Sequence, residues 1–252
     1  MSVDGYIKDL EIGKSLDPKE AVKSLNLNSK LNTATQVENF LLLNTGDRDV
    51  SMFFINTVDE FIQAEALARQ LGLGFKSRPS FIPDPNGGYN IFLRGFTFTN
   101  EEKSKELDNL HPSKPPSSEI EANYRFSPMF HKKIGDILDY PPCCVKTYVE
   151  DTSLLIDPDE RITTQVADYK RKNKKPNPDA FYLVEFLPCR PDCENASTIG
   201  RAYEKGLKNK VNENVANLYG QLKLEHLRNV ETGKFLRQKE SGKKKYFNFP
   251  ML

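Results

Sequence analysis

The sequence has no long hydrophobic segment, few cysteines and almost no net charge. No stretch of its 252 residues approaches the roughly 18 consecutive apolar residues of a transmembrane helix. Four cysteines are too few for a small secreted fold built on disulfides, and the first residues carry acidic side chains where a signal peptide has an apolar core. We therefore expect a cytoplasmic protein with reduced thiols that does not enter a membrane.

The charges are balanced, with 36 Lys and Arg against 35 Asp and Glu. A protein with this balance does not have the net positive charge that most nucleic-acid-binding proteins carry. Two basic runs are present, Lys170–Lys175 and Lys243–Lys245, and the second is followed by two aromatic residues, a combination that can bind single-stranded nucleic acid. The first run coincides with an expected helix end, where cations interact favourably with the helix dipole. Nucleic acid is thus a partner that the sequence allows but does not favour.

The first 110 residues predict a small mixed α/β layer. Residues 1–35 are polar and weakly periodic, which indicates short helical or irregular structure. Residues 37–43 have helical spacing, and residues 50–55 are rich in strand-forming side chains. A capping box at Thr57 and Glu60 starts a helix that runs to Gly72. Two apolar segments between residues 75 and 93 flank turn residues and indicate a hairpin or a longer strand connection.

The second half has a different pattern. Ser127-Pro128 and Asp157-Pro158 are N-cap and first-turn pairs, each followed by an apolar helical stripe. Pro191-Asp192 opens the longest helical pattern, which continues to about residue 227. Residues 181–187 form an apolar run that suits either a strand or a helix.

These patterns divide the chain into three parts. Residues 1–110 form the α/β region, residues 111–126 a linker rich in proline and serine, and residues 127–252 a mainly helical region. The expected fold class is α/β or α+β, with the small mixed layer packed on the helical half.

All four cysteines fall in the second half, as the pairs Cys143-Cys144 and Cys189-x₃-Cys193. Both pairs adjoin prolines, which are tolerated in the first turn of a helix. We therefore expect both pairs at helix N-termini, where free amides and the positive end of the helix dipole favour thiolates. A thiolate binds metals and attacks electrophiles, so the two pairs are predicted to converge on one site.

The cysteine motifs resemble a known family. His131, Gly135 and Leu138, followed by Tyr140-Pro141-Pro142-Cys143-Cys144-Val145 and by Pro188-Cys189-Arg190-Pro191-Asp192-Cys193 with Ser197, are similar to an uncharacterised prokaryotic family, domain of unknown function 483, which is well represented in archaea. The resemblance covers roughly residues 125–205 and implies one shared site without implying an activity. The family has a histidine just before the second motif, where this chain has Phe186-Leu187. If that histidine is a ligand or a base, Glu185, His131 or His226 would have to replace it.

Several kinds of cysteine site fit this pattern. Four thiolates can hold a structural zinc, although adjacent cysteines differ from the usual Cys-x₂₋₄-Cys spacing, and an iron–sulfur cluster tolerates more varied spacing. A thiol redox pair is the third interpretation, and four buried, unreactive cysteines are the fourth.

The predicted metal ligands are Cys144, Cys189 and Cys193, with Cys143 as the alternate and His131 as a further group from the preceding helix. Adjacent helical side chains point roughly 100° apart, so Cys143 and Cys144 are not expected to face one ion easily. The sequence leaves three functions open. One is an enzyme that uses this site on a small molecule or modified nucleoside, another is a non-catalytic binding or regulatory module with a structural metal, and the third is a thiol redox protein.

Overall fold

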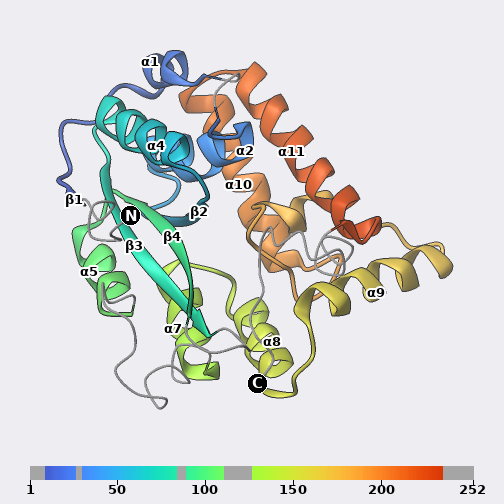
Figure 1. The fold of residues 1–252 in the computed structure, drawn as a ribbon. Helices are drawn as coiled ribbons and strands as arrows, with labels where there is room; N and C mark the ends of the chain where they lie inside the picture. Colours follow the sequence, from blue (N-terminus) through green and yellow to red (C-terminus); the bar gives the residue numbers. More distant parts are fainter. Residues whose placement is uncertain (1–8, 27–29, 84–88, 111–126, 235–252) are drawn as a thin grey trace. The chain divides into compact units, whose positions relative to one another are not determined.

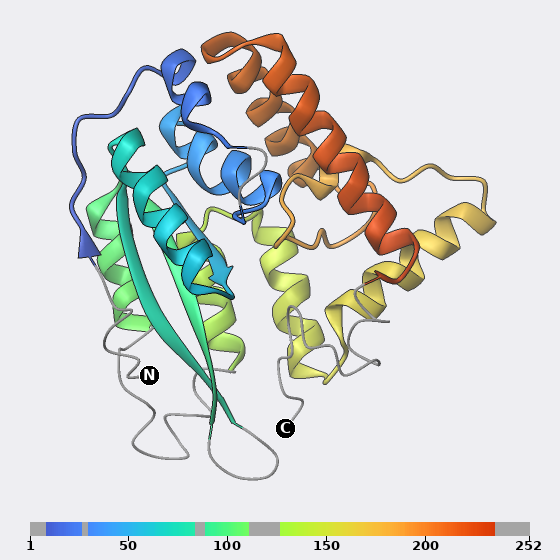
Figure 2. The ribbon, with the colours of Figure 1, turned by 45° about the horizontal axis from the view of Figure 1, so that its top comes forward.

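The computed structural model describes residues 9–26, 30–83, 89–110 and 127–234. Figures 1 and 2 show their helices and strands. The chain divides into two compact units. The first unit comprises residues 1–123 together with residues 206–215, and the second comprises residues 124–205 and 216–252. The predicted linker, residues 111–126, and the basic run Lys243–Lys245 lie outside the described residues.

The first unit contains a four-stranded antiparallel sheet with the strand order β1-β3-β4-β2. Its strands are β1 (Asp9–Leu10), β2 (Val50–Ile55), β3 (Gly74–Pro83) and β4 (Tyr89–Phe98). Its helical segments are α1 (Pro18–Ala21), η2 (Val22–Ser24), α2 (Thr33–Gln36), the π-helical η3 (Val37–Leu41), α3 (Leu42–Asn44), α4 (Val58–Leu71) and α5 (Glu101–Leu110). The predicted strand at residues 50–55 is confirmed, and the two segments expected to form a hairpin or a longer strand connection pair as the antiparallel strands β3 and β4.

Helices cover both faces of this sheet. On one face, Phe53 of β2 contacts Phe40 of η3 with ring centroids 5.4 Å apart, and Phe75 of β3 contacts Phe61 of α4 at 5.9 Å. On the opposite face, Lys76 of β3 forms a 2.9 Å ion pair with Asp108 of α5. Buried aromatic side chains lie on both faces, because Phe96 and Phe98 of β4 share the face of Lys76.

The start of α4 follows the predicted cap closely. The Thr57 hydroxyl accepts a hydrogen bond from the Glu60 amide at 3.1 Å, and Gly72 ends the helix with a left-handed φ of 67°. The Glu60 carboxylate accepts from the Asn56 amide at 2.7 Å, one residue before the usual capping-box partner. Both ends of α4 are thus fixed by residues that the sequence identifies.

The second unit is mainly helical, as predicted. Its elements are α7 (Pro128–Ile137), α8 (Pro142–Ser153), α9 (Pro158–Arg171), the short 3₁₀ helix η4 (Pro178–Phe181) and most of α10 (Glu194–Lys210) and α11 (Glu213–Glu231). The Ser127 hydroxyl accepts from the Phe130 amide and the Asp157 carboxylate from the Asp159 amide, which confirms both predicted N-caps. Over the described residues, no helix has both the length and the apolar character that crossing a bilayer requires.

The long C-terminal helical pattern is two helices, not one. Helix α10 ends at Lys210 and α11 begins at Glu213. The Asn212 side chain caps α11 by accepting a 2.9 Å hydrogen bond from the Val215 amide. The apolar 181–187 run, which suited either a strand or a helix, forms the end of η4 and an irregular segment instead of a strand. Its side chains Phe181, Tyr182 and Phe186 are buried.

Candidate metal centre

The structure confirms the predicted convergence of the two cysteine pairs. All four Sγ atoms lie within 4.8 Å of one another. The Cys143 sulfur lies 3.8 Å from that of Cys144 and 3.7 Å from that of Cys193, and the sulfurs of Cys144 and Cys193 are 3.6 Å apart. All four cysteines are free thiols.

Two helix N-termini supply three of these sulfurs. Cys143 and Cys144 lie in the first turn of α8, directly after Pro142. Cys193 immediately precedes α10, and its carbonyl accepts the first helical hydrogen bond, 2.9 Å from the Ser197 amide. Cys189 differs from the prediction, because it lies in the loop before α10.

The adjacent cysteines do not diverge as the helical spacing suggested. Their sulfurs are 3.8 Å apart, and both belong to the cluster. The cause is rotation about χ1, because each sulfur is one bond beyond Cβ and can turn toward a shared point even when the Cα–Cβ bonds diverge by roughly 100°.

Arg161 of α9 fixes the loop that carries Cys189. Its guanidinium donates to the carbonyl oxygens of Cys189 at 3.0 Å and Pro188 at 3.2 Å. The same group forms a 2.5 Å ion pair with Asp151, and both side chains are nearly buried. Sequence reasoning missed Arg161, because nothing local to this residue indicates that it contacts a loop 27 residues further along the chain.

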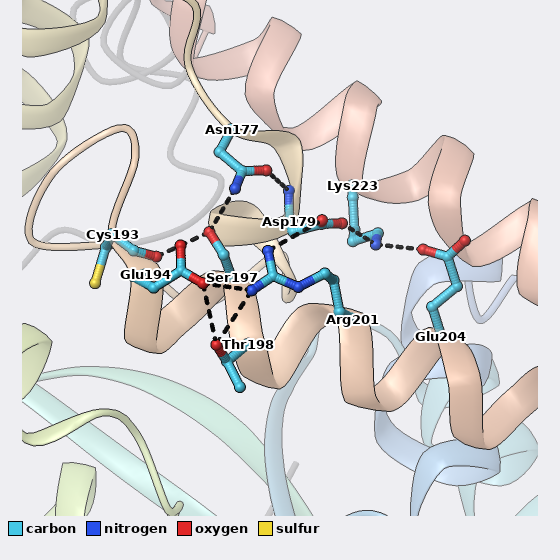
Figure 3. A network of polar contacts seen from close by, with 9 residues as sticks. All are labelled: Asn177, Asp179, Cys193, Glu194, Ser197, Thr198, Arg201, Glu204 and Lys223. Atoms are coloured by element: carbon cyan, nitrogen blue, oxygen red, sulfur yellow. Dashed lines mark hydrogen bonds and ion pairs between the residues drawn. The ribbon is translucent and has the colours of Figure 1, made fainter.

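The backbone at Cys193 is held from the side opposite its sulfur (Figure 3). The Ser197 hydroxyl donates to the Cys193 carbonyl at 2.8 Å, and the Asn177 amide donates to the Ser197 hydroxyl at 2.8 Å. The Asn177 side chain also accepts from the Asp179 amide at 3.1 Å. This chain of hydrogen bonds connects the first turn of α10 to η4.

Asp179 extends this network to a buried lysine (Figure 3). The ammonium group of Lys223, on α11, lies 2.5 Å from a carboxylate oxygen of Asp179 and 2.5 Å from one of Glu204. The Lys223 side chain is only 3% exposed, whereas the two carboxylates are partly exposed. Ion pairing therefore ties α11 to α10 and η4 within the second unit.

The surroundings shift the pKa values of the cysteines in opposite directions. Hydrogen bonds from the neighbouring thiols, that of Cys144 foremost, lower the pKa of Cys189 to about 5. The hydrogen bond to Cys189 and burial raise the pKa of Cys144, and burial raises the pKa of Cys193 to about 11. Cys189 thus loses its proton more readily than Cys144 and Cys193 do.

Two further N–H groups point at the sulfurs. The Cys189 amide donates to the Cys144 sulfur at 3.4 Å, and the Asn195 side-chain amide donates to the Cys143 sulfur at 3.4 Å. Hydrogen bonds of this kind stabilise negative charge on sulfur. These two donors therefore favour negative charge at Cys143 and Cys144, and at Cys144 the amide opposes the increase in pKa that the neighbouring thiol and burial cause.

His131 is not among the side chains that form the cluster. It is buried on α7, and its ring contacts those of Phe130 at 5.7 Å and Tyr148 at 5.3 Å. The other two side chains considered as replacements for the family's histidine, Glu185 and His226, are also outside the cluster. His226 is buried, with Nδ1 3.3 Å from the Phe181 carbonyl oxygen.

Three of the four sulfurs, those of Cys143, Cys144 and Cys193, have the spacing expected around one tetrahedrally coordinated ion. An ion about 2.3 Å from each of four sulfurs at the corners of a tetrahedron separates those sulfurs by about 3.8 Å. The three separations given above, 3.6 to 3.8 Å, agree with this value. In a [4Fe–4S] cluster each thiolate binds a different iron atom, which requires sulfurs farther apart.

Comparison with known proteins places this site in a family. Residues 104–228, about half of the chain, match the model of a family described as a protein of unknown function (DUF483). An uncharacterised protein of Methanocaldococcus jannaschii, MJ1106, is 38% identical over 65 residues, which are 25% of this chain and 34% of that protein. The chain thus aligns with about a third of this curated relative. No solved structure matches the chain. The resemblance drawn from the cysteine motifs is confirmed, and through residues 104–228, which include all four cysteines, the chain belongs to the DUF483 family.

Proposed function

We propose that this protein binds one zinc ion through the thiolates of Cys143, Cys144, Cys189 and Cys193, and that the ion stabilises the helical unit. The sulfur separations of 3.6 to 3.8 Å carry this proposal, because they equal the edge of a tetrathiolate tetrahedron. Zinc is the usual occupant of a four-cysteine tetrahedral site. When bound, the ion would supply a cross-link between segments distant in sequence.

The donor set favours a structural role over catalysis at the ion. Catalytic zinc sites have three protein ligands and one open position, whereas structural sites have four. Here four sulfurs within 4.8 Å of one another are available as ligands, and they come from the first turn of α8, the loop at Cys189 and the start of α10. The proposal therefore favours a metal-stabilised binding or regulatory module over an enzyme that uses the metal on a small molecule or modified nucleoside.

A thiol redox role is the second candidate. Free sulfurs less than 4 Å apart are close enough to form disulfides after small movements, and two cysteines of the cluster, Cys143 and Cys189, are partly exposed. Both candidates require thiols, so we propose a reducing compartment, the cytoplasm, as the place of action.

Metal content measured on the full chain tests the proposal. The protein, expressed with zinc and purified without chelator, should contain one zinc per chain by elemental analysis and native mass spectrometry. Cobalt should replace zinc and give the visible absorption of a tetrahedral tetrathiolate. Each of Cys143→Ser, Cys144→Ser, Cys189→Ser and Cys193→Ser should reduce the metal content.

A matched control is Ser153→Ala, an exposed position at the far end of α8, which should keep one zinc per chain. A brown protein that contains several iron atoms and inorganic sulfide would contradict the single-ion site and show that the cysteines bind an iron–sulfur cluster. Metal-free protein whose cysteines form disulfides reversibly would favour the redox candidate.

A further inference from the structure

Three consecutive apolar side chains project into solvent at the turn between α8 and α9. Leu154, Leu155 and Ile156, which we call the apolar tip, are 70%, 60% and 44% exposed. Single exposed apolar residues are common on protein surfaces, but adjacent ones indicate a contact surface.

The backbone of the apolar tip is fixed in an unusual conformation. Leu155 has a φ of 58°, in the left-handed region that disfavours side chains other than glycine and asparagine. The amides of Leu154 and Ile156 donate to the carbonyls of Glu150 at 3.0 Å and Asp151 at 2.9 Å, and Arg161 holds the Asp151 side chain. This is the left-handed C-cap that also follows α7 at Asp139 and α9 at Asn173, and it holds the turn in one conformation.

Acidic residues border the apolar tip. Glu150 precedes it, and Asp157, Asp159 and Glu160 follow it. Two cations lie near these acids, because Arg161 pairs with Asp151 and Lys146 of α8 lies 3.8 Å from Glu150. Residues 146–161 still carry five acidic side chains against two basic ones. A ligand that complements this surface is therefore apolar and basic.

The chain contains such a segment. Residues 243–252 read KKKYFNFPML, three lysines followed by mostly apolar and aromatic side chains. This basic run has no role in the proposed zinc site, and we infer that residues 243–252 bind the apolar tip of the same chain. The lysines would face the acidic border, and the aromatic side chains would cover Leu154, Leu155 and Ile156.

The geometry of the second unit allows this contact. An ion pair of 3.1 Å between Lys170 and Glu231 places the end of α11 beside the end of α9. The start of α9, next to the apolar tip, is about 21 Å away along its 14 residues. Residues 232–242 can span up to about 36–40 Å when extended, so the basic segment reaches the tip.

Photo-crosslinking in the full chain tests this inference. The photoreactive amino acid benzoylphenylalanine in place of Phe249 should form a cross-link within one chain to residues 150–160, identified by mass spectrometry of the monomer fraction. Two variants should each reduce the yield several-fold: the pair Leu154→Ser and Ile156→Ser, and the triple charge reversal Lys243→Glu, Lys244→Glu and Lys245→Glu.

The control is the pair Lys172→Glu and Lys175→Glu, which reverses charge in the other basic run at exposed positions and should leave the yield unchanged. Far-UV circular dichroism and the urea unfolding midpoint of each variant report whether the fold is intact. A cross-link to a second copy of the chain, a cross-link to any other segment, or a yield that the tip variants do not change would overturn the inference. None of these results depends on whether the cysteines bind zinc.

Discussion

His226 makes the stability of the helical unit depend on pH. The side chain is 2% exposed, and its ring contacts that of Phe181 edge-on with centroids 5.8 Å apart. Burial lowers the pKa of this imidazole from 6.5 to about 4, although hydrogen bonds to backbone groups of Phe181 and Leu183 oppose the change. When the pH lies between these two pKa values, the imidazole is protonated in the unfolded chain and neutral in the folded chain. The free energy of unfolding must therefore decrease as the pH falls from about 7 to 4.

The expected loss follows from the two pKa values. From pH 7 to pH 5 it is about 2 kcal/mol, and by pH 4 it reaches about 3 kcal/mol. Urea titrations monitored by circular dichroism at pH 7, 6 and 5 measure it, with saturating zinc throughout. The matched variant is His226→Gln, which has a similar size and does not titrate.

Acid also protonates thiolate ligands, so the decisive quantity is the difference between wild type and variant. This difference should change by about 2 kcal/mol between pH 7 and pH 5, with the variant losing less. Equal losses in both proteins would refute the reasoning and mean that His226 is protonated at little cost in the folded state.

Three other changes test separate contacts. Arg161→Gln should weaken zinc binding about 10–100-fold in a chelator competition assay, because the carbonyls of Pro188 and Cys189 lose their shared donor; unchanged affinity would show that the loop is fixed without it. Lys223→Met should lower the free energy of unfolding by about 1–3 kcal/mol in urea, less than for a fully buried pair because Asp179 and Glu204 are partly exposed; an unaltered transition midpoint would contradict this. Gly135→Ala should cost about 1–3 kcal/mol, seen as a lower Tm, since a Cβ there would lie 2.6 Å from the Val145 side chain, and an unchanged Tm would mean that α7 and α8 move apart freely.

Helix starts were predictable because their signals are local. Thr57, Ser127 and Asp157 each cap the helix that the sequence assigns to them. The break at Asn212 was missed because apolar spacing continues across it, and asparagine is also tolerated inside helices. Val211 and Val215 are buried on either side of the break, as the pattern predicts. Further along α11, Tyr219 and Lys223 are buried, whereas Leu218 and Leu222 are only half-buried.

The cysteine cluster was predictable to the extent that proline-flanked motifs mark helix starts. The positions of Cys143, Cys144 and Cys193 follow from this rule. Two features depend on tertiary contacts that no local pattern encodes. One is the side-chain rotation that brings adjacent cysteines together, and the other is the contact of Arg161 with the Cys189 loop.

The first unit is discontinuous in sequence, because residues 206–215 belong to it and the intervening residues 124–205 do not. Lys210 contributes to this unit by pairing with Asp47 at 2.9 Å and donating to the Thr45 carbonyl at 2.7 Å. During synthesis, the first unit is therefore complete only after a further 92 residues have been translated, about 5–20 s at common elongation rates. A nascent chain that stalls before residue 206 would present an incomplete first unit to chaperones, so ribosome pausing within the cysteine-bearing segment should affect the yield of the sheet as well as that of the helices.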